Sequence, residues 1–355
     1  MNNIFNFNPV KAKYNINNVL DQAKSKFSNE FKTANQIICD IDKTYLETEY
    51  DSFMKMAKIA FQNAEEKKNV IGAKFFFNIL QSNLQSSNHI HFVSSSPSQL
   101  NKVFQEKFYL DAIDWNSLSL KNQVYNIKKI RFKLLNQQTA YKTLAIIKLL
   151  NKSKNNFFFI GDNDESDLYI YLGLYALVNK KISKSSYKEY LKTAEIDPSV
   201  IDKILQSIHI SEKTTVKGIF IRNVLAHNQI EHPVIHNQVF FFNHYIELLI
   251  HFIDREIIDP IKFRPFLLKL HNHENISVKS IVEMLKQFTT NFTIEKKSTS
   301  QRILDEIKFF TKNLTEATDL SPPPKFIMNK KEDLINENLI MDFAKKWQAS
   351  QKQKG

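Results

Sequence analysis

The sequence predicts an α/β fold of three layers, in which a central, mostly parallel sheet lies between helices. Two apolar runs indicate buried strands, and both end in carboxylates: residues 37–42 (Ile-Ile-Cys-Asp-Ile-Asp) and residues 157–162 (Phe-Phe-Phe-Ile-Gly-Asp). An Ile or Phe run with a sharp polar end is typical of a strand that helices cover on both faces. Ligands bind beyond the carboxyl ends of such strands, so we expect the carboxylates to meet in one crevice.

The chain around these runs supplies a further strand and several helices. Residues 89–95 (His-Ile-His-Phe-Val-Ser-Ser) predict a strand that ends in hydroxyls, and Ser96 with Pro97 predicts the N-cap and first residue of a helix. Lys142 begins an apolar-periodic segment directly before the second acidic strand. Helices at 51–58 and 73–84 fill most of the chain between the first two strands, which leaves little room for a cap domain over the crevice.

The carboxylates imply a bound cation. Four aspartates are placed to share the crevice: Asp40, Asp42, Asp162 and Asp167. They would repel one another unless a cation lay among them, and oxygen ligands favour Mg²⁺, which usually pairs with substrate phosphate. Each acid could instead cap the helix that follows its strand. Asp164 competes with Asp162 as a ligand, and we favour Asp162 because it follows Gly161 at the strand end.

The order of the motifs resembles the haloacid dehalogenase superfamily of phosphotransferases: Asp-x-Asp-x-Thr, a strand ending in Ser, a Lys, and Gly-Asp-x₄-Asp. A closer resemblance is to the catalytic region of the actin-patch-associated phosphatidate phosphatases and their bacterial relatives. The matching blocks are residues 40–44, 92–100, 141–142, 161–171 and 219–224, within a region of about 36–225. The resemblance implies a Rossmann-like domain that hydrolyses phosphomonoesters with Mg²⁺ through an aspartyl-phosphate, with phosphatidate as the leading substrate.

The resemblance also implies the role of each residue. Asp40 would be the nucleophile, and Asp42 would protonate the leaving oxygen and then activate water. Three side chains would bind the phosphoryl oxygens: Ser94, Ser95 and Lys142. Mg²⁺ would be held by Asp40, the Asp42 backbone carbonyl and Asp162, with Asp167 on the ion or one contact away.

Several positions depart from the family's pattern. Lys43 stands where the family often has Asp, Asn163 and Asp164 replace Ser-Gly, Leu168 replaces Pro, and Asn223 replaces Asp. None of these changes removes a residue with an implied catalytic role. Residues 176–215 separate the last acidic motif from the Arg222 strand by more than the family usually allows, which predicts an inserted helical element.

These features divide the chain into four segments: an extension at 1–35, a phosphatase domain at 36–235 with the insertion at about 176–215, a helical region at 236–320, and a linker, helix and basic tail at 321–355. Pro322, Pro323 and Pro324 mark the linker. Residues 239–253 predict a buried helix that is too short and too polar to cross a bilayer. We therefore expect no transmembrane segment.

Composition excludes some functions and suggests partners. Five glycines in 355 residues exclude a glycine-rich nucleotide loop. A single cysteine, Cys39, fits a reducing compartment, so we expect a cytoplasmic location. The net charge of +12 would attract phosphorylated substrates and anionic membrane surfaces, which fits a peripheral membrane enzyme. The basic residues are spread widely along the chain, so an ordinary solvated surface explains the charge equally well.

Three other functions stay open. The insertion and the C-terminal helices could adapt the site to a soluble metabolite or a phosphoprotein. Arg222 and His227 have the Arg-Asn-x₃-His spacing that resembles HEPN ribonucleases, and the positive charge would then bind RNA. We disfavour nucleic acid because residues 218–221 predict a strand before Arg222, and a strand end there would contradict the ribonuclease. A binding module without turnover is disfavoured because every implied catalytic residue is present.

Overall fold

The computed structural model describes residues 34–48, 63–82, 87–121, 131–224, 239–289, 297–314 and 336–354. The predicted helix at 51–58, the proline linker, His227 and nearly all of the 1–35 extension lie outside these residues. No described helix is long and apolar enough to cross a membrane.

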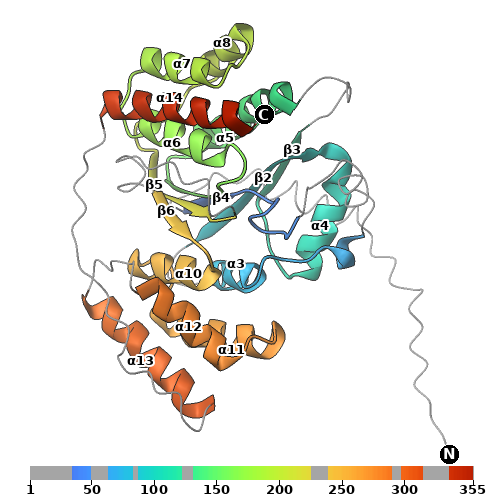
Figure 1. Ribbon diagram of the computed structural model, residues 1–355, viewed down its shortest axis with the longest axis vertical. Helices are drawn as coiled ribbons and strands as arrows, with labels where there is room; N and C mark the ends of the chain where they lie inside the picture. The colour runs from blue at the N-terminus through green and yellow to red at the C-terminus, as the bar shows by residue number, and fades with distance from the viewer. Residues whose placement is uncertain are drawn as a thin grey trace, which may run out of the picture.

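A six-stranded sheet of order β3-β2-β1-β4-β5-β6 forms the centre of the molecule. Every neighbouring pair of strands is parallel. The strands are β1 (Asn35–Cys39), β2 (Asn88–Pro97), β3 (Ser117–Lys121), β4 (Asn156–Asp162), β5 (Thr215–Arg222) and β6 (Val239–Phe242). The predicted fold class is confirmed, since the sheet has a helical layer on each face (Figure 1).

Helices cover both faces because alternate strand residues point to opposite sides. Ile37 and Cys39 of β1 belong to one hydrophobic core, and Ile38 belongs to the other. The first core packs against α3 (Ala73–Gln81), α4 (Asn101–Leu110), α10 (Tyr245–Asp254), α11 (Phe263–His273), α12 (Val278–Thr289) and α13 (Lys297–Leu314). The second packs against α5 (Arg131–Lys152), α6 (Asp167–Val178), α7 (Lys184–Thr193), α8 (Pro198–Gln206) and α14 (Glu337–Lys354).

The C-terminal helix α14 packs on the side of the sheet opposite to α10–α13, the helices that precede it in the chain (Figure 1). The ring of Trp347 stacks on Tyr169 of α6, with the ring centroids 4.2 Å apart. Ile340 and Phe343 are also buried in this core. α14 is therefore a part of the layer that carries α5 and α6.

The helix predicted over residues 239–253 is wrong in its first part. Val239–Phe242 forms β6 and pairs with β5, from Ile219 opposite Val239 to Arg222 opposite Phe242. The helix α10 begins only at Tyr245, where the Glu247 side chain accepts hydrogen bonds from the backbone of Asn243 and His244. A short run of Val and Phe fits a strand as well as a buried helix, and pairing with β5 decides between them.

The helix start predicted at Ser96 and Pro97 is also wrong. β2 continues to Pro97, a 3₁₀ turn follows at Ser98–Leu100, and α4 begins at Asn101. Ser96 does not cap a helix, because its hydroxyl donates to the Asp42 carboxylate at 2.6 Å. A contact with a distant strand end has replaced the local one.

The predicted helix between the first two strands and the predicted helical insertion at 176–215 are both present. The helix predicted at 73–84 is α3, and α7 and α8 lie within residues 176–215. Between β1 and β2, the described residues form only a 3₁₀ turn at Ala64–Glu66 and α3. The sheet continues through β6 past residue 235, and the division into domains stays a prediction.

Candidate active site

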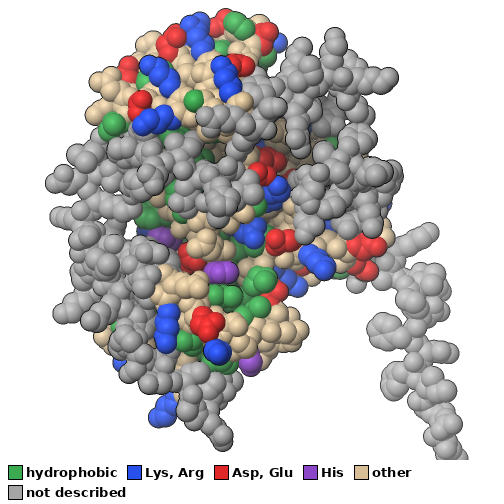
Figure 2. Space-filling view, in the orientation of Figure 1, with side chains coloured by type: hydrophobic (Ala, Val, Ile, Leu, Met, Phe, Trp, Pro, Cys, Tyr) green, Lys and Arg blue, Asp and Glu red, His purple; other side chains and the backbone are tan. Residues whose placement is uncertain are grey.

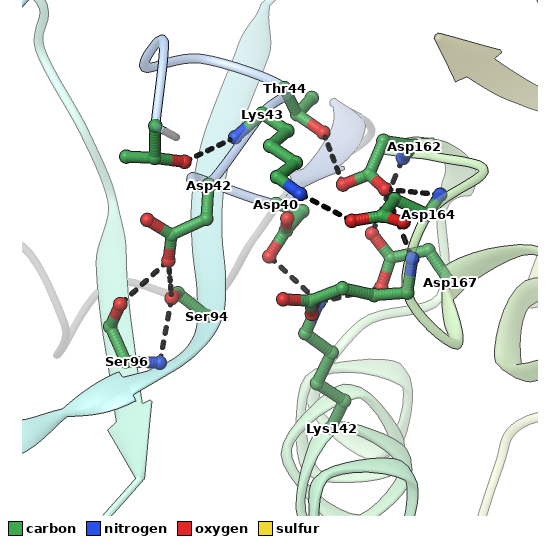
Figure 3. Close-up of polar contacts among 12 residues, drawn as sticks. Asp40, Asp42, Lys43, Thr44, Ser94, Ser96, Lys142, Asp162, Asp164 and Asp167 are labelled. Carbon is green, nitrogen blue, oxygen red and sulfur yellow. Dashed lines mark hydrogen bonds and ion pairs between the residues drawn. The ribbon is translucent and has the colours of Figure 1, made fainter. Parts of the chain in front are cut away.

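Carboxylates converge at the carboxyl ends of β1 and β4. The strands are adjacent and parallel, so residues that follow them lie at one edge of the sheet. The Asp40 backbone N–H donates to the Ile160 carbonyl at 2.9 Å, which fixes the turn after β1 against β4. One carboxylate oxygen from each of Asp40, Asp162 and Asp167 lies within 4.8 Å of the others, and all three side chains are buried (Figure 3).

Gly161 allows Asp167 to approach the strand end. A Cβ atom at residue 161 would lie 2.5 Å from Asp167 Oδ2 and 2.7 Å from the Tyr171 ring, so any other residue would push α6 away. The Asp162 backbone N–H also faces Asp167 Oδ2 at 3.4 Å. The Gly-Asp pair therefore brings both ends of the β4–α6 loop together.

Lys142 reaches this group from α5 and is itself buried. Its Nζ lies 2.9 Å from Asp40 Oδ1, 2.7 Å from Asp167 Oδ1 and 3.1 Å from Glu165 Oε2. Glu165 has no role in the predicted site, although its place in the acidic loop after β4 is a signal that could have identified it. We call Asp40, Lys142, Asp162, Glu165 and Asp167 the acidic cluster.

The acidic cluster holds excess negative charge in a buried place. Burial, together with the charge of Asp167, raises the pKa of Asp162 to about 8. Burial also raises the pKa of Asp40 well above its usual range, and the charge of Lys142 opposes that rise. Burial alone would lower the pKa of Lys142, but the carboxylates of Asp167 and Asp40 raise it well above its usual value. A single lysine does not balance so many carboxylates, so the cluster favours an added cation.

The donor set suits a hard divalent metal ion. Asp40 Oδ1 pairs with Lys142, but Asp40 Oδ2 is buried and has no partner among the described residues, which leaves its lone pairs for a ligand. All ligand atoms of the Asp40, Asp162 and Asp167 group are carboxylate oxygens. The Asp164 carboxylate instead pairs with Lys43, while its backbone N–H donates to Asp162 Oδ1 at 2.7 Å. This geometry favours Asp162 over Asp164 as the ligand.

Asp42 lies in a different environment from Asp40. Its Oδ2 accepts hydrogen bonds from Ser94 Oγ at 3.0 Å and from Ser96 Oγ at 2.6 Å. Figure 3 shows Asp42 turned toward β2, whereas Asp40 faces Lys142. Ser96 was missed as a site residue, and the alternation that puts residues 94 and 96 on one side of a strand is the signal that could have found it.

Ser94 and Ser95, both expected to bind phosphate, differ in their contacts. Ser94 is engaged with Asp42 and also accepts a hydrogen bond from the Ser96 backbone N–H at 2.9 Å. The Ser95 hydroxyl is buried and has no hydrogen-bond partner among the described residues. Of these two serines, Ser95 is the one whose hydroxyl can still donate a hydrogen bond to a ligand.

Arg222 is the last residue of β5 and does not lie in a helix. Its Nη1 donates to the Lys43 carbonyl at 2.5 Å, so the side chain points to the turn after β1. The HEPN-like ribonuclease would need Arg222 inside a helix, so its position at the end of β5 argues against that function.

A known protein family matches the part of the chain that carries the acidic cluster. Residues 35–186 match the sequence model of a family described as "Phosphatidate phosphatase APP1, catalytic domain". The resemblance found in the motifs is confirmed over less than half of the chain, and this part is an enzyme domain of a phosphatase family. The match includes the whole acidic cluster and ends in α7, so β5 and β6 lie beyond it.

Other comparisons add little. Among solved structures, a chain of "Structure of Pnkp1/Rnl/Hen1 complex" matches with 11% identity and a TM-score of 0.27, over 38% of this chain and 41% of that chain. A likeness at this TM-score carries no argument about fold or function. No curated protein matches the sequence.

Proposed function

We propose that this chain is a Mg²⁺-dependent phosphomonoester hydrolase that acts through an aspartyl-phosphate, with phosphatidate or a related lipid phosphate as its substrate. One observation carries the chemistry: Asp40, Asp162 and Asp167 converge around Lys142 in a buried cluster at the strand ends. Phosphoryl transfer depends above all on positioning and on neutralising charge, which such a cluster provides once a metal ion is bound.

Asp40 is the proposed nucleophile. A carboxylate oxygen of Asp40 attacks phosphorus, an Asp40 O–P bond forms, and the bond to the leaving oxygen breaks. Mg²⁺ bound by Asp40, Asp162 and Asp167 would offset the repulsion between this carboxylate and the phosphoryl dianion. Asp40 Oδ2 fits this role, because it has no hydrogen-bond or ion-pair partner among the described residues, whereas Oδ1 pairs with Lys142.

Asp42 is the proposed acid and base. It gives a proton to the leaving oxygen in the first step and takes one from water in the second, when the Asp40 O–P bond breaks and phosphate leaves. The hydroxyls of Ser94 and Ser96 hold its carboxylate in one orientation. Such bonds to neutral donors restrict the side chain without adding a charge.

The proposed phosphate-binding groups are Lys142 and the serines that end β2. Lys142 places a buried positive charge against Asp40, where the phosphoryl group would arrive. Ser95 has an unused hydroxyl donor, and Ser94 would act mainly through Asp42. We therefore expect Ser95 to contribute more to substrate binding than Ser94.

A lipid phosphate is supported by the family match and by charge. The matched family is described as a phosphatidate phosphatase, and a chain of net charge +12 is attracted to an anionic bilayer. On the face shown in Figure 2, basic and acidic side chains are mixed over α7, α8 and α14. Lys188 of α7 and Asp202 of α8 form one exposed ion pair of this kind. We propose a cytoplasmic enzyme that acts at the membrane surface.

The test compares phosphate release from phosphatidate vesicles with release from soluble phosphomonoesters at equal concentration. We expect cleavage of the vesicles that requires Mg²⁺ and is absent in Asp40→Asn. Turnover of a sugar or nucleotide phosphate without turnover of vesicles would replace the lipid with a soluble metabolite. Turnover by Asp40→Asn as fast as by the wild type would contradict the mechanism.

A further inference from the structure

An ion pair between Lys43 and Asp164 joins the loop after β1 to the loop after β4 (Figure 3). The side chains are only 18% and 26% exposed, so water screens this pair less than a surface pair. Lys43 and Asp164 are also both among the positions that depart from the family's pattern. The first loop carries Asp40 and Asp42, and the second begins directly after Asp162, the last residue of β4, so the pair spans the proposed site.

The backbone of Lys43 is fixed on both sides. Its N–H donates to Thr48 Oγ1 at 3.0 Å, and its carbonyl accepts from Arg222 Nη1 at 2.5 Å. Lys43 has a φ of 58°, in the left-handed region, where a residue with a Cβ atom costs about 1–2 kcal/mol. The two bonds hold this conformation, which aims the Lys43 side chain at Asp164.

The other end of the pair is connected to a metal ligand. The backbone N–H of Asp164 donates to Asp162 Oδ1 at 2.7 Å, so the position of Asp164 orients the Asp162 carboxylate. Asn163, the residue between Asp162 and Asp164, is fixed to β5, because its backbone N–H donates to the Arg222 carbonyl at 3.1 Å. Lys43, Asp164, Asn163 and Arg222 thus close a ring of contacts over the ends of β1, β4 and β5.

We propose that Lys43 is a positioning residue for the metal site: through Asp164 it fixes the Asp162 carboxylate at the distance from Asp40 that a divalent metal requires. Arg222 supports it by holding the Lys43 backbone. This inference rests on the proposed function only in taking Asp40, Asp162 and Asp167 as the metal ligands.

The sign of the effect distinguishes positioning from simple electrostatics. Lys43 carries a positive charge near the acidic cluster, so removing that charge alone would strengthen metal binding. Losing the contact would instead release Asp164 and Asp162, and losing a partner that orients a ligand typically weakens metal binding 10–100-fold. The two effects oppose each other, and we expect the positioning effect to be the larger.

The experiment is a titration with Mn²⁺ alone, followed by electron paramagnetic resonance, so that no turnover is needed. We expect Lys43→Met to bind Mn²⁺ about 10-fold more weakly than the wild type, within the range for such contacts. Lys43→Arg should stay within about threefold, and the exchange Lys43→Asp with Asp164→Lys should recover most of the loss. Lys180→Met removes an exposed ion pair with Glu212 and should change nothing.

Unfolding curves show whether each variant is folded, and Asp162→Asn reports the loss of a ligand. If Lys43→Met does not fold, Lys43→Arg and the exchanged pair still test the inference. Equal or tighter Mn²⁺ binding by Lys43→Met, or no recovery in the exchanged pair, would overturn the positioning role while the metal site itself stands. Absence of Mn²⁺ binding by the wild type would overturn the metal site and this inference together.

Discussion

Two buried polar clusters lie in the same sheet, and they differ in charge and in pairing. The acidic cluster stands at the carboxyl ends of β1 and β4, with one lysine among several carboxylates and no described partner for Asp40 Oδ2. The histidine cluster lies within β1, β2 and β3. There the ring of His91 contacts Ser117 Oγ at 2.7 Å through Nδ1 and Gln36 Oε1 at 2.8 Å through Nε2.

The two clusters show how a buried polar group with a function differs from one that stabilises the fold. Burial lowers the pKa of His91 to about 3, so the ring is neutral and both nitrogens are paired. A satisfied neutral cluster stabilises the fold. The acidic cluster instead keeps an unpaired oxygen, Asp40 Oδ2, and excess negative charge, which cost stability unless a ligand is bound. A buried polar atom that has no hydrogen-bond partner therefore indicates a functional site, whereas burial of a polar group alone does not.

The largest expected effect is that of Asp40→Asn, which should reduce phosphomonoester turnover more than about 100-fold, since catalytic groups contribute factors of this size or more. The melting temperature should not fall, because the buried charge is costly and Lys142 keeps Glu165 and Asp167. Steady-state kinetics and thermal unfolding measure the two effects. The matched variant His91→Gln should show the reverse, a lower melting temperature with turnover nearly unchanged; loss of activity there would break the comparison.

Metal removal should act on the acidic cluster alone. We expect EDTA to abolish turnover and Mg²⁺ to restore it. Mg²⁺ at about 100 times its dissociation constant should also stabilise the folded wild type by about 2.7 kcal/mol. Thermal unfolding with and without Mg²⁺ measures this gain. Asp162→Asn should lose most of this Mg²⁺-dependent stabilisation, and His91→Gln should keep it. Full activity of the wild type in excess EDTA would contradict the metal site.

Acid should destabilise the fold through the histidine cluster. The pKa of His91 is lowered from 6.5 to about 3 in the folded state, so the unfolded chain takes up a proton first as pH falls. The stability that the neutral ring contributes is complete above pH 6.5 and is lost as pH falls toward 3. Between pH 6.5 and 5 the loss should be about 2 kcal/mol, since each pH unit is worth about 1.4 kcal/mol. Denaturant unfolding at several pH values gives the free energy of unfolding as a function of pH, and this free energy should fall less steeply with falling pH in His91→Gln. An unchanged pH dependence would show that another group causes the acid sensitivity.

The smallest expected effect concerns Asp42, a buried carboxylate that neutral hydroxyls hold. Ser96→Ala removes the hydrogen bond at 2.6 Å and should lower kcat about 10-fold, equivalent to about 1.4 kcal/mol of lost orientation. Ser117→Ala removes a comparable bond to His91 and should lower stability by about 1 kcal/mol without changing kcat. Equal kcat values for the two variants would show that Ser96 has only a structural role.

The strands that border the site, β1, β2, β4 and β5, and the edge of the sheet that carries the site could be predicted from the sequence. Apolar runs that end in Asp40 and Asp162 specify buried parallel strands, and the carboxyl ends of parallel strands share one edge. Lys142 came from the order of the motifs, since a lysine in an apolar-periodic helix is otherwise expected to be solvated. These features are local, so they can be read along the chain.

Only the tertiary structure decided which side chains meet. Strand pairing with β5 made residues 239–242 a strand and not the start of a helix. Contacts between segments that are distant in the chain pair Ser96 with Asp42, Glu165 with Lys142, and Lys43 with Asp164. Each of these contacts joins residues more than 20 positions apart. Their partners depend on strand order, register and loop conformation, and no spacing within a single segment specifies those.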